Sequence, residues 1–175
     1  MAPVGNLDGV LVAPISSELV LDIVSHSAAQ TQRFGARLGE LAHAGDLICL
    51  EGDLGSGKTC FVQGLGRGLG IPAAIHSPTF ILANEHRGGR LPLFHLDVYR
   101  MSGVEEAIGI GLDDYISGEG VCVIEWAEKI RHVLPMDWMW VAFRHVDTNK
   151  RGLLMEARGA RYHKLLDEFR SGAFG

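Results

Sequence analysis

The hydrophobic positions along the chain alternate between short apolar runs and helical spacings. Residues 47–50 and 121–124 are uninterrupted apolar runs, which are typical of parallel strands buried on both faces. Phe34, Leu38 and Leu41 instead recur at spacings of four and three, which predicts an amphipathic helix. Because strand-like and helix-like segments follow one another along the chain, the pattern predicts an α/β fold.

Turn and capping residues set the other boundaries. Ser27 and Gln30 have the spacing of a capping box, and Ser102 and Glu105 repeat it before a second, short helix. Residues 58–69 are expected to form a helix that ends before Gly70 and Pro72. The remaining expected elements are strands at 19–24, 79–85, 91–99, 138–145 and 153–157, and a final helix at 161–169.

The domain organisation is predicted from the length of the chain and from where Pro and Gly residues occur. A chain of 175 residues suits one globular domain. Residues 1–17 are rich in Pro and Gly and show little periodicity, so they are expected to form a loose arm. Residues 18–175 are expected to form a single domain with a central mixed sheet, helices on both faces and an antiparallel β portion.

The composition indicates a cytoplasmic protein. No apolar stretch reaches the 18 or so residues that a membrane-spanning helix needs. The first Lys or Arg is Arg33, which argues against secretory and mitochondrial targeting segments. Cys49, Cys60 and Cys122 are an odd number without metal-ligand spacing, and we expect free thiols in a reducing compartment.

The net charge of −5 is unevenly distributed. Residues 1–128 carry 7 Lys and Arg against 16 Asp and Glu, whereas residues 129–175 carry 9 against 5. The basic end is either a solvated face or a surface that meets phosphates, RNA or an acidic partner. Charge does not decide between these two interpretations.

The most informative motif is Gly-Asp-Leu-Gly-Ser-Gly-Lys-Thr at residues 52–59. It matches the phosphate-binding pattern G-x-x-x-x-G-K-[ST], in which backbone amides and the start of a helix surround phosphates. Lys58 is then expected to neutralise phosphate oxygens and the Thr59 hydroxyl to ligate Mg²⁺. The motif predicts a P-loop protein that binds a nucleoside triphosphate, ATP with Mg²⁺ above all.

A chance match is the alternative, in which the loop is a glycine-rich turn without a ligand. The residue frequencies of this chain give about 0.005 expected matches to the motif. The motif also follows a short apolar strand and opens a helix, which is the context that the pattern requires. A nucleotide site is therefore the better explanation.

A P-loop protein needs a carboxylate at the end of a second strand to complete the Mg²⁺ shell. Glu125 ends a purely apolar run, and Asp97 ends a run that contains His95. We expect His95 to disfavour a fully buried strand and to fit one with alternating faces. From the residues alone, one of the two carboxylates supports the metal and the other orients water or the γ-phosphate.

Further residues near these elements have competing interpretations. Ser77 and Thr79 flank Pro78 in a segment that either contacts the γ-phosphate or only enters a strand. Trp126 adjoins Glu125 and is expected near the site, whereas the other tryptophans are expected in the core. Residues 149–152, Asn-Lys-Arg-Gly, lack the Asp of the guanine-reading Asn-Lys-x-Asp segment, which weakens a GTPase interpretation.

Four segments together resemble one family. They are residues 52–59, Ser-Pro-Thr-Phe at 77–80, His-Leu-Asp-Val-Tyr-Arg at 95–100 and Ile-Glu-Trp at 124–126. In this order they resemble the bacterial TsaE (YjeE) family, the ATPase subunit of the machinery that makes threonylcarbamoyladenosine (t6A) in tRNA. The resemblance extends from about Leu19 to Arg131.

The resemblance implies roles for individual residues. Thr59 and Glu125 would ligate Mg²⁺, and Asp97 would be needed for hydrolysis. The residues implied to contact the nucleotide are Thr31, near the base, and Gly55, Ser56, Gly57, Lys58, Thr59 and Cys60, around the phosphates. Cys60 and Ala127 depart from the usual Thr and Pro of the family at these positions.

The resemblance also implies how the chain acts. The family works through a complex of the TsaD and TsaB proteins, where ATP turnover resets the complex between rounds of threonylcarbamoyl transfer to adenosine 37 of tRNA. A net acidic chain agrees with an indirect role, since an autonomous tRNA binder is expected to carry a basic stripe. Two alternatives are a small-molecule kinase and a nucleotide-sensing module that does not hydrolyse ATP. A kinase usually needs an arginine-bearing lid, and no Arg-rich segment stands out, although Arg87 and Arg90 in the glycine-rich turn could serve.

Overall fold

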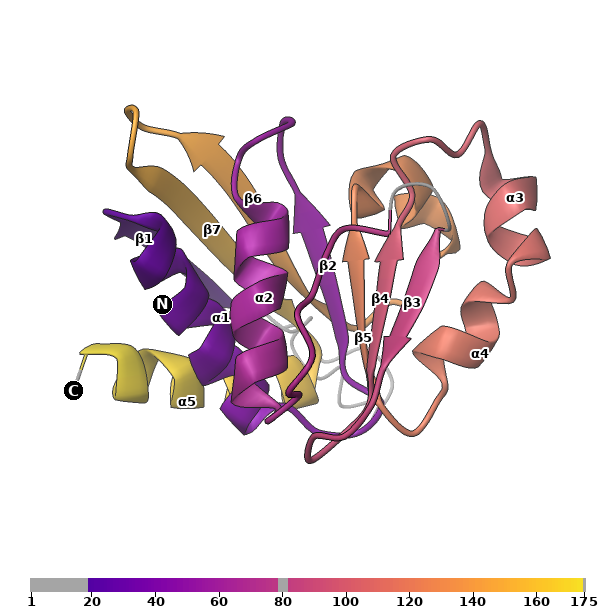
Figure 1. The fold of residues 1–175 in the computed structure, drawn as a ribbon, viewed down its shortest axis with the longest axis horizontal. Helices are drawn as coiled ribbons and strands as arrows, with labels where there is room; N and C mark the ends of the chain where they lie inside the picture. The colour runs from indigo at the N-terminus through magenta and orange to yellow at the C-terminus, as the bar shows by residue number, and fades with distance from the viewer. Residues whose placement is uncertain (1–18, 79–81, 175) are drawn as a thin grey trace, which may run out of the picture.

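A computed structural model describes residues 19–78 and 82–174 and contains a seven-stranded mixed sheet in the order β1-β7-β6-β2-β5-β4-β3 (Figure 1). The predicted arm at residues 1–17 lies outside the described residues. The strands are β1 (Leu19–Ser25), β2 (Leu47–Glu51), β3 (Ala83–His86), β4 (Leu93–Asp97), β5 (Val121–Glu125), β6 (Trp138–His145) and β7 (Arg151–Arg158).

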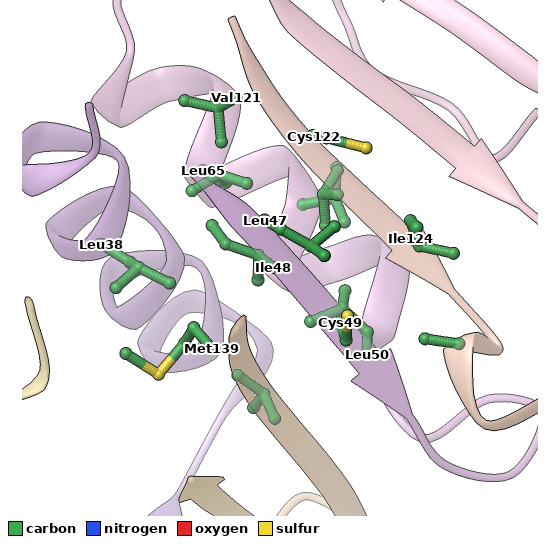
Figure 2. Packing of buried hydrophobic residues seen from close by; sticks show 14 of the residues in the cluster. Leu38, Leu47, Ile48, Cys49, Leu50, Leu65, Val121, Cys122, Ile124 and Met139 are labelled. Carbon is green, nitrogen blue, oxygen red and sulfur yellow. The ribbon is translucent and has the colours of Figure 1, made fainter. Parts of the chain in front are cut away.

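The centre of the sheet is parallel and its margins are antiparallel. Strand β2 pairs in parallel with β5 and β6, and β5 pairs in parallel with β4. Strand β3 pairs antiparallel with β4, and β7 pairs antiparallel with both β6 and β1. The two apolar runs of the sequence form the neighbouring strands β2 and β5, whose side chains pack in the core (Figure 2). The predicted mixed sheet with an antiparallel portion is confirmed.

Helices cover both faces of the sheet. The helices α1 (Ala28–Leu41), α2 (Lys58–Gly68) and α5 (Ala160–Phe174) share one face, where the rings of Phe61 and Phe143 are 5.6 Å apart. Trp140 points to the other face because side chains alternate along β6. There the guanidinium of Arg131, in the 3₁₀ helix η1 (Ala127–Val133), lies 4.4 Å from the Trp140 ring.

Helices α1 and α2 approach each other unusually closely. At four glycines, an added Cβ would lie 2.0–2.3 Å from a backbone carbonyl oxygen of the opposite helix. Since real Cβ atoms do not come so close, only glycine permits this packing. The contact fixes the position of α2, whose first residues are the last two of the phosphate-loop motif. The four positions are Gly35, Gly39, Gly64 and Gly68.

The helix starts agree with the predicted capping boxes only in part. The Ser27 hydroxyl accepts from the Gln30 amide at 3.1 Å and caps α1 as predicted. The second box is wrong by one residue, because Gly103 caps α3 (Val104–Gly109) and Ser102 pairs with Glu106. Helix α4 (Leu112–Ile116) and η1 were not predicted.

Across the described ranges, 19–78 and 82–174, no helix has the length and apolar character that crossing a membrane requires. The longest is α5, with 15 residues. It continues to Phe174, five residues beyond the predicted end of that helix.

Candidate functional site

The candidate site lies where three parallel strands end. Glu125, the last residue of β5, pairs in register with Leu50 of β2 and with Asp97, the last residue of β4. The loop at residues 52–57 leaves β2 at this edge and leads into α2. Ligands of open α/β sheets bind outside the carboxyl ends of the strands. The topology therefore brings the phosphate-loop motif and both candidate carboxylates to one place.

The loop presents the start of α2 without a side-chain cap. Gly57 precedes the helix in the left-handed region, with φ 108°, and as a glycine it has no side chain that could cap the first amides. A Cβ on Gly52 would meet the carbonyl oxygen of Phe143 at 2.9 Å, so the loop also needs glycine where it passes β6. Uncapped amides at the positive end of a helix attract anions.

Lys58 bends back over the loop that precedes it. Its ammonium donates to the carbonyl of Gly52, to the carbonyl of Asp53 at 3.0 Å and to the hydroxyl of Ser56 at 3.5 Å. Burial lowers the pKa of Lys58, while the nearby carboxylates, Glu125 first among them, act in the opposite direction. The positive charge is thus held at the loop by backbone oxygens.

Thr59 and Glu125 are in direct contact. The Thr59 hydroxyl lies 2.9 Å from Glu125 Oε1 and 3.2 Å from Oε2, and it donates to this carboxylate. Oε1 also lies 2.9 Å from the Nε2 atom of His95. Glu125 and His95 are both buried in the sheet. The Thr59 hydroxyl and the Glu125 carboxylate, both oxygen ligands of the kind that Mg²⁺ prefers, therefore lie next to each other.

Asp97 accepts hydrogen bonds from a side chain and from the backbone. The Ser77 hydroxyl donates to Oδ2 at 2.7 Å, and the backbone amide of Tyr99 donates to Oδ1 at 2.9 Å. The carboxylate is 2% exposed. Ser77, from the segment before β3, thereby lies beside Asp97, while its contact with the γ-phosphate stays a prediction. Thr79, the other residue named there, lies outside the described residues.

Trp126 follows Glu125 in a left-handed conformation, with φ 63°. Its ring lies 4.0 Å from the Lys58 ammonium and 4.6 Å from the Tyr99 ring. Positive φ is uncommon for a bulky residue, and such residues concentrate at functional sites. The other two tryptophans, Trp138 and Trp140, are buried in the core, as predicted.

These groups surround one cavity of about 610 Å³. Every residue of the loop from Gly55 to Cys60 lines it, together with both candidate carboxylates. Two further lining residues, Tyr99 and Arg100, had no predicted role, although both lie within three residues of Asp97. The remaining lining residues are Leu54, Ser77 and Trp126.

Thr31 lies on the other side of the loop. Its side chain is 2% exposed and its hydroxyl is 2.7 Å from that of Ser25. It borders a smaller cavity of about 250 Å³, which is also lined by Gly55, Gly57 and Cys60. The turn between β6 and β7 closes this cavity with Thr148, Asn149 and Arg151.

One expectation, about His95, was wrong, and the structure does not support the lid of the kinase alternative. All five residues of β4 are buried, including His95, because the Nε2 atom of its ring pairs with Glu125 and strands β3 and β5 flank it. Arg87 and Arg90 belong to the turn before β4, at the opposite end of that strand from Asp97. Arg90 donates to carbonyls at the end of α1, such as Gly39 O at 2.7 Å, so neither arginine lines the cavity as a lid.

The donors present suit a hard cation that brings its own oxygen ligands. In the described part of the chain, no three His, Cys, Asp or Glu side chains are grouped as a complete metal site. Thr59 and Glu125 offer two oxygen ligands beside an uncapped helix start. Mg²⁺ binds in this way, through one or two protein oxygens completed by phosphates and water.

The chain is similar to known proteins of one family. Residues 25–153 match the family model described as threonylcarbamoyl adenosine biosynthesis protein TsaE, so the match begins later than the resemblance from Leu19 and continues beyond Arg131. A protein of that name from Bacillus subtilis is 40% identical over 79% of this chain and 87% of its own length. The one from Treponema pallidum is 46% identical over 69% of this chain and 89% of its own length.

The fold is also similar to a solved structure. The crystal structure of Bacillus subtilis YdiB superimposes with a TM-score of 0.79 and 34% sequence identity. The similarity covers 90% of this chain and 98% of that one. The family model, the relatives and the fold lead to the same conclusion: the chain belongs to the TsaE family.

Proposed function

We propose that this chain binds ATP with Mg²⁺ and hydrolyses it as a subunit of the machinery that makes t6A at adenosine 37 of tRNA. The observation that carries the proposal is one cavity into which Lys58, the Thr59–Glu125 pair and the Ser77–Asp97 pair all project. The names of the family and of its relatives connect it with t6A biosynthesis.

The phosphates of ATP would occupy the loop from Gly55 to Cys60. Backbone amides at the uncapped start of α2 would donate to phosphate oxygens, aided by the positive end of the helix. Lys58 would exchange its contacts with the loop carbonyls for contacts with β- and γ-phosphate oxygens. The smaller cavity beside Thr31 would receive the base.

Mg²⁺ would be held by the Thr59 hydroxyl and the Glu125 carboxylate. When bound, the ion would neutralise charge on the β- and γ-phosphates. Asp97 would orient the attacking water, because its carboxylate lines the same cavity and is itself fixed by Ser77 and the Tyr99 amide. The chain would thus supply positioning and electrostatic stabilisation, which dominate phosphoryl-transfer catalysis.

The chain would act on tRNA through other proteins. Its net charge of −5 does not favour autonomous RNA binding, which depends on basic surfaces that neutralise phosphates. We propose the TsaB–TsaD complex as the partner, so the cycle of ATP binding and hydrolysis would drive a change in that complex. The threonylcarbamoyl transfer itself would take place on the partner.

The test combines an ATPase assay with a pull-down, each with and without TsaB and TsaD. Slow hydrolysis by the chain alone and a changed rate with both partners are expected. Asp97→Ala should remove hydrolysis and keep ATP binding, and Asp113→Ala is the control, since Asp113 is an exposed acid outside the cavity. Hydrolysis and binding that do not respond to the partners would refute the partner assignment.

A further inference from the structure

His95 is a buried polar residue that the roles above leave unexplained. It lies in the middle of β4, its side chain is 0% exposed, and its Nε2 atom is 2.9 Å from Glu125 Oε1. Its Nδ1 atom has no hydrogen-bond partner among the described residues. An imidazole with one unpaired nitrogen stabilises a buried strand less than an apolar side chain does. Fold stability alone therefore does not account for this residue.

The contacts determine which nitrogen carries the proton. The Thr59 hydroxyl donates to the Glu125 carboxylate, which acts as an acceptor. Nε2 of His95 must then donate to Oε1. Nδ1 has no hydrogen-bond partner among the described residues, so Nε2 is the nitrogen through which the ring is held.

We propose that His95 is a positioning residue for Glu125, and this proposal rests on the proposed Mg²⁺–ATP function. The Nε2–H bond holds Oε1 from the side of β4, while the Thr59 hydroxyl contacts the same carboxylate from α2. Glu125 then stays directed at Thr59 before the metal arrives. Partners that orient a metal-binding carboxylate in this way typically contribute 10- to 100-fold in metal affinity.

Three variants distinguish the contribution of the Nε2–H hydrogen bond from that of the ring's volume. His95→Gln keeps an amide donor at a reach similar to that of Nε2. His95→Phe fills the volume of the imidazole without a donor. His86→Phe is the matched control, because the His86 ring is 6.3 Å from the His95 ring and no hydrogen bond joins it to Glu125.

The experiment measures ATP binding by calorimetry over a range of Mg²⁺ concentrations and in EDTA. For His95→Phe, we expect half-saturation at a 10- to 100-fold higher Mg²⁺ concentration, with unchanged ATP affinity in EDTA. His95→Gln and His86→Phe should remain close to the wild type. The idea is overturned if His95→Phe responds to Mg²⁺ as the wild type does, or if its only defect is weaker binding in EDTA.

The wild-type response to Mg²⁺ and one further measurement separate the possible failures. If the wild type itself shows no Mg²⁺-dependent ATP binding, the proposed function fails before the variants are compared. If the wild type responds and the His95 variants match it, only the role of His95 fails. Nitrogen-detected NMR of the wild type tests the geometry without any substitution: a hydrogen on Nε2 supports the proposal, and an Nε2 atom without a hydrogen contradicts it.

Discussion

A buried carboxylate lies beside each end of β2, and the two carboxylates have different hydrogen-bond partners. At the amino end, Asp46 accepts from the Arg161 guanidinium at 2.7 and 2.9 Å and from the backbone amide of His43 at 2.7 Å. At the carboxyl end, Glu125 is held by the Thr59 hydroxyl and the His95 ring. The first carboxylate forms an ion pair with an arginine, whereas the second accepts from a hydroxyl and an imidazole and has the Lys58 ammonium nearby.

This difference separates a structural acid from a site acid. A buried ion pair with matched hydrogen bonds is complete, and removing one partner destabilises the fold. A buried carboxylate held by a hydroxyl and an imidazole beside a cavity is still able to bind a metal cation from outside. We therefore expect substitutions at the amino end to change stability and substitutions at the carboxyl end to change ligand binding.

The largest effect is expected for Arg161→Leu, which leaves Asp46 buried without its cation. The free energy of unfolding should fall by about 3 kcal/mol, the low end for a broken buried pair because the Arg161 side chain is 26% exposed. ATP affinity should not change. Denaturant unfolding and calorimetry test both statements, with the exposed Arg170→Leu as control. If Arg161→Leu bound ATP more weakly than the wild type, the two ends of β2 would not have separate roles.

Lys58→Ala should show the opposite pattern. Losing its charged hydrogen bonds to phosphate should cost roughly 2–3 kcal/mol of ATP binding, or about 30- to 160-fold in affinity. Stability should fall little, because burial lowers the pKa of Lys58 and so disfavours its charged form in the fold. Calorimetry on this variant and on the exposed Lys164→Ala measures the effect. Equal affinities for the two variants would contradict it.

Tyr162→Phe tests a hydrogen bond at the amino end of β2 through the pH dependence of stability. The Leu47 amide donates to the Tyr162 hydroxyl at 2.7 Å, so the variant should lose about 1–2 kcal/mol of stability at neutral pH. Burial raises the pKa of Tyr162 to about 12, whereas the unfolded value is about 10.

The sign of this pH effect follows from the raised pKa. The folded state keeps the phenol proton to a higher pH than the unfolded state does. The contribution is complete below about pH 10 and is lost as the pH rises to about 12, by at most about 1.4 kcal/mol per pH unit. The stability difference between wild type and variant should shrink over this window in unfolding titrations. A constant difference would be incompatible with the raised pKa of Tyr162.

The smallest effect is expected for Asp22→Ala. Its partner Arg144 lies at 2.8 Å, a distance similar to those in the Asp46–Arg161 pair, but the two side chains are 56% and 47% exposed. Solvent screening limits an exposed pair to about 1 kcal/mol or less. Unfolding in denaturant should therefore detect little change. A loss as large as that of Arg161→Leu would mean that burial is not what distinguishes the two pairs.

The sequence predicted the site best in segments where the structure tolerates few residue types at each position. The phosphate-loop motif and the apolar strand before Glu125 determined the main contacts, because backbone geometry and strand burial restrict both segments. His95 misled the prediction, since a polar residue in a short strand indicates exposure unless its partner is known. That partner, Glu125, lies 30 residues away and meets it only through the pairing of β4 with β5.

Short and irregular elements escaped prediction for a related reason. Helix α4 has five residues, too few to show a helical period. Trp126 enters η1 in a left-handed conformation that its residue type does not favour. The position of Thr148 and Asn149 beside the smaller cavity depends on how the β6–β7 hairpin extends past β2, which local patterns do not encode.

The close approach of α1 to α2 limits how this chain can diverge among descendants. Any side chain at Gly35, Gly39, Gly64 or Gly68 would push apart two helix backbones that touch each other directly. These positions should therefore resist replacement as strongly as the phosphate loop does, although none of them lines either cavity beside that loop. Across a set of homologues, invariance would then mark two unrelated requirements, and only one of them concerns the nucleotide.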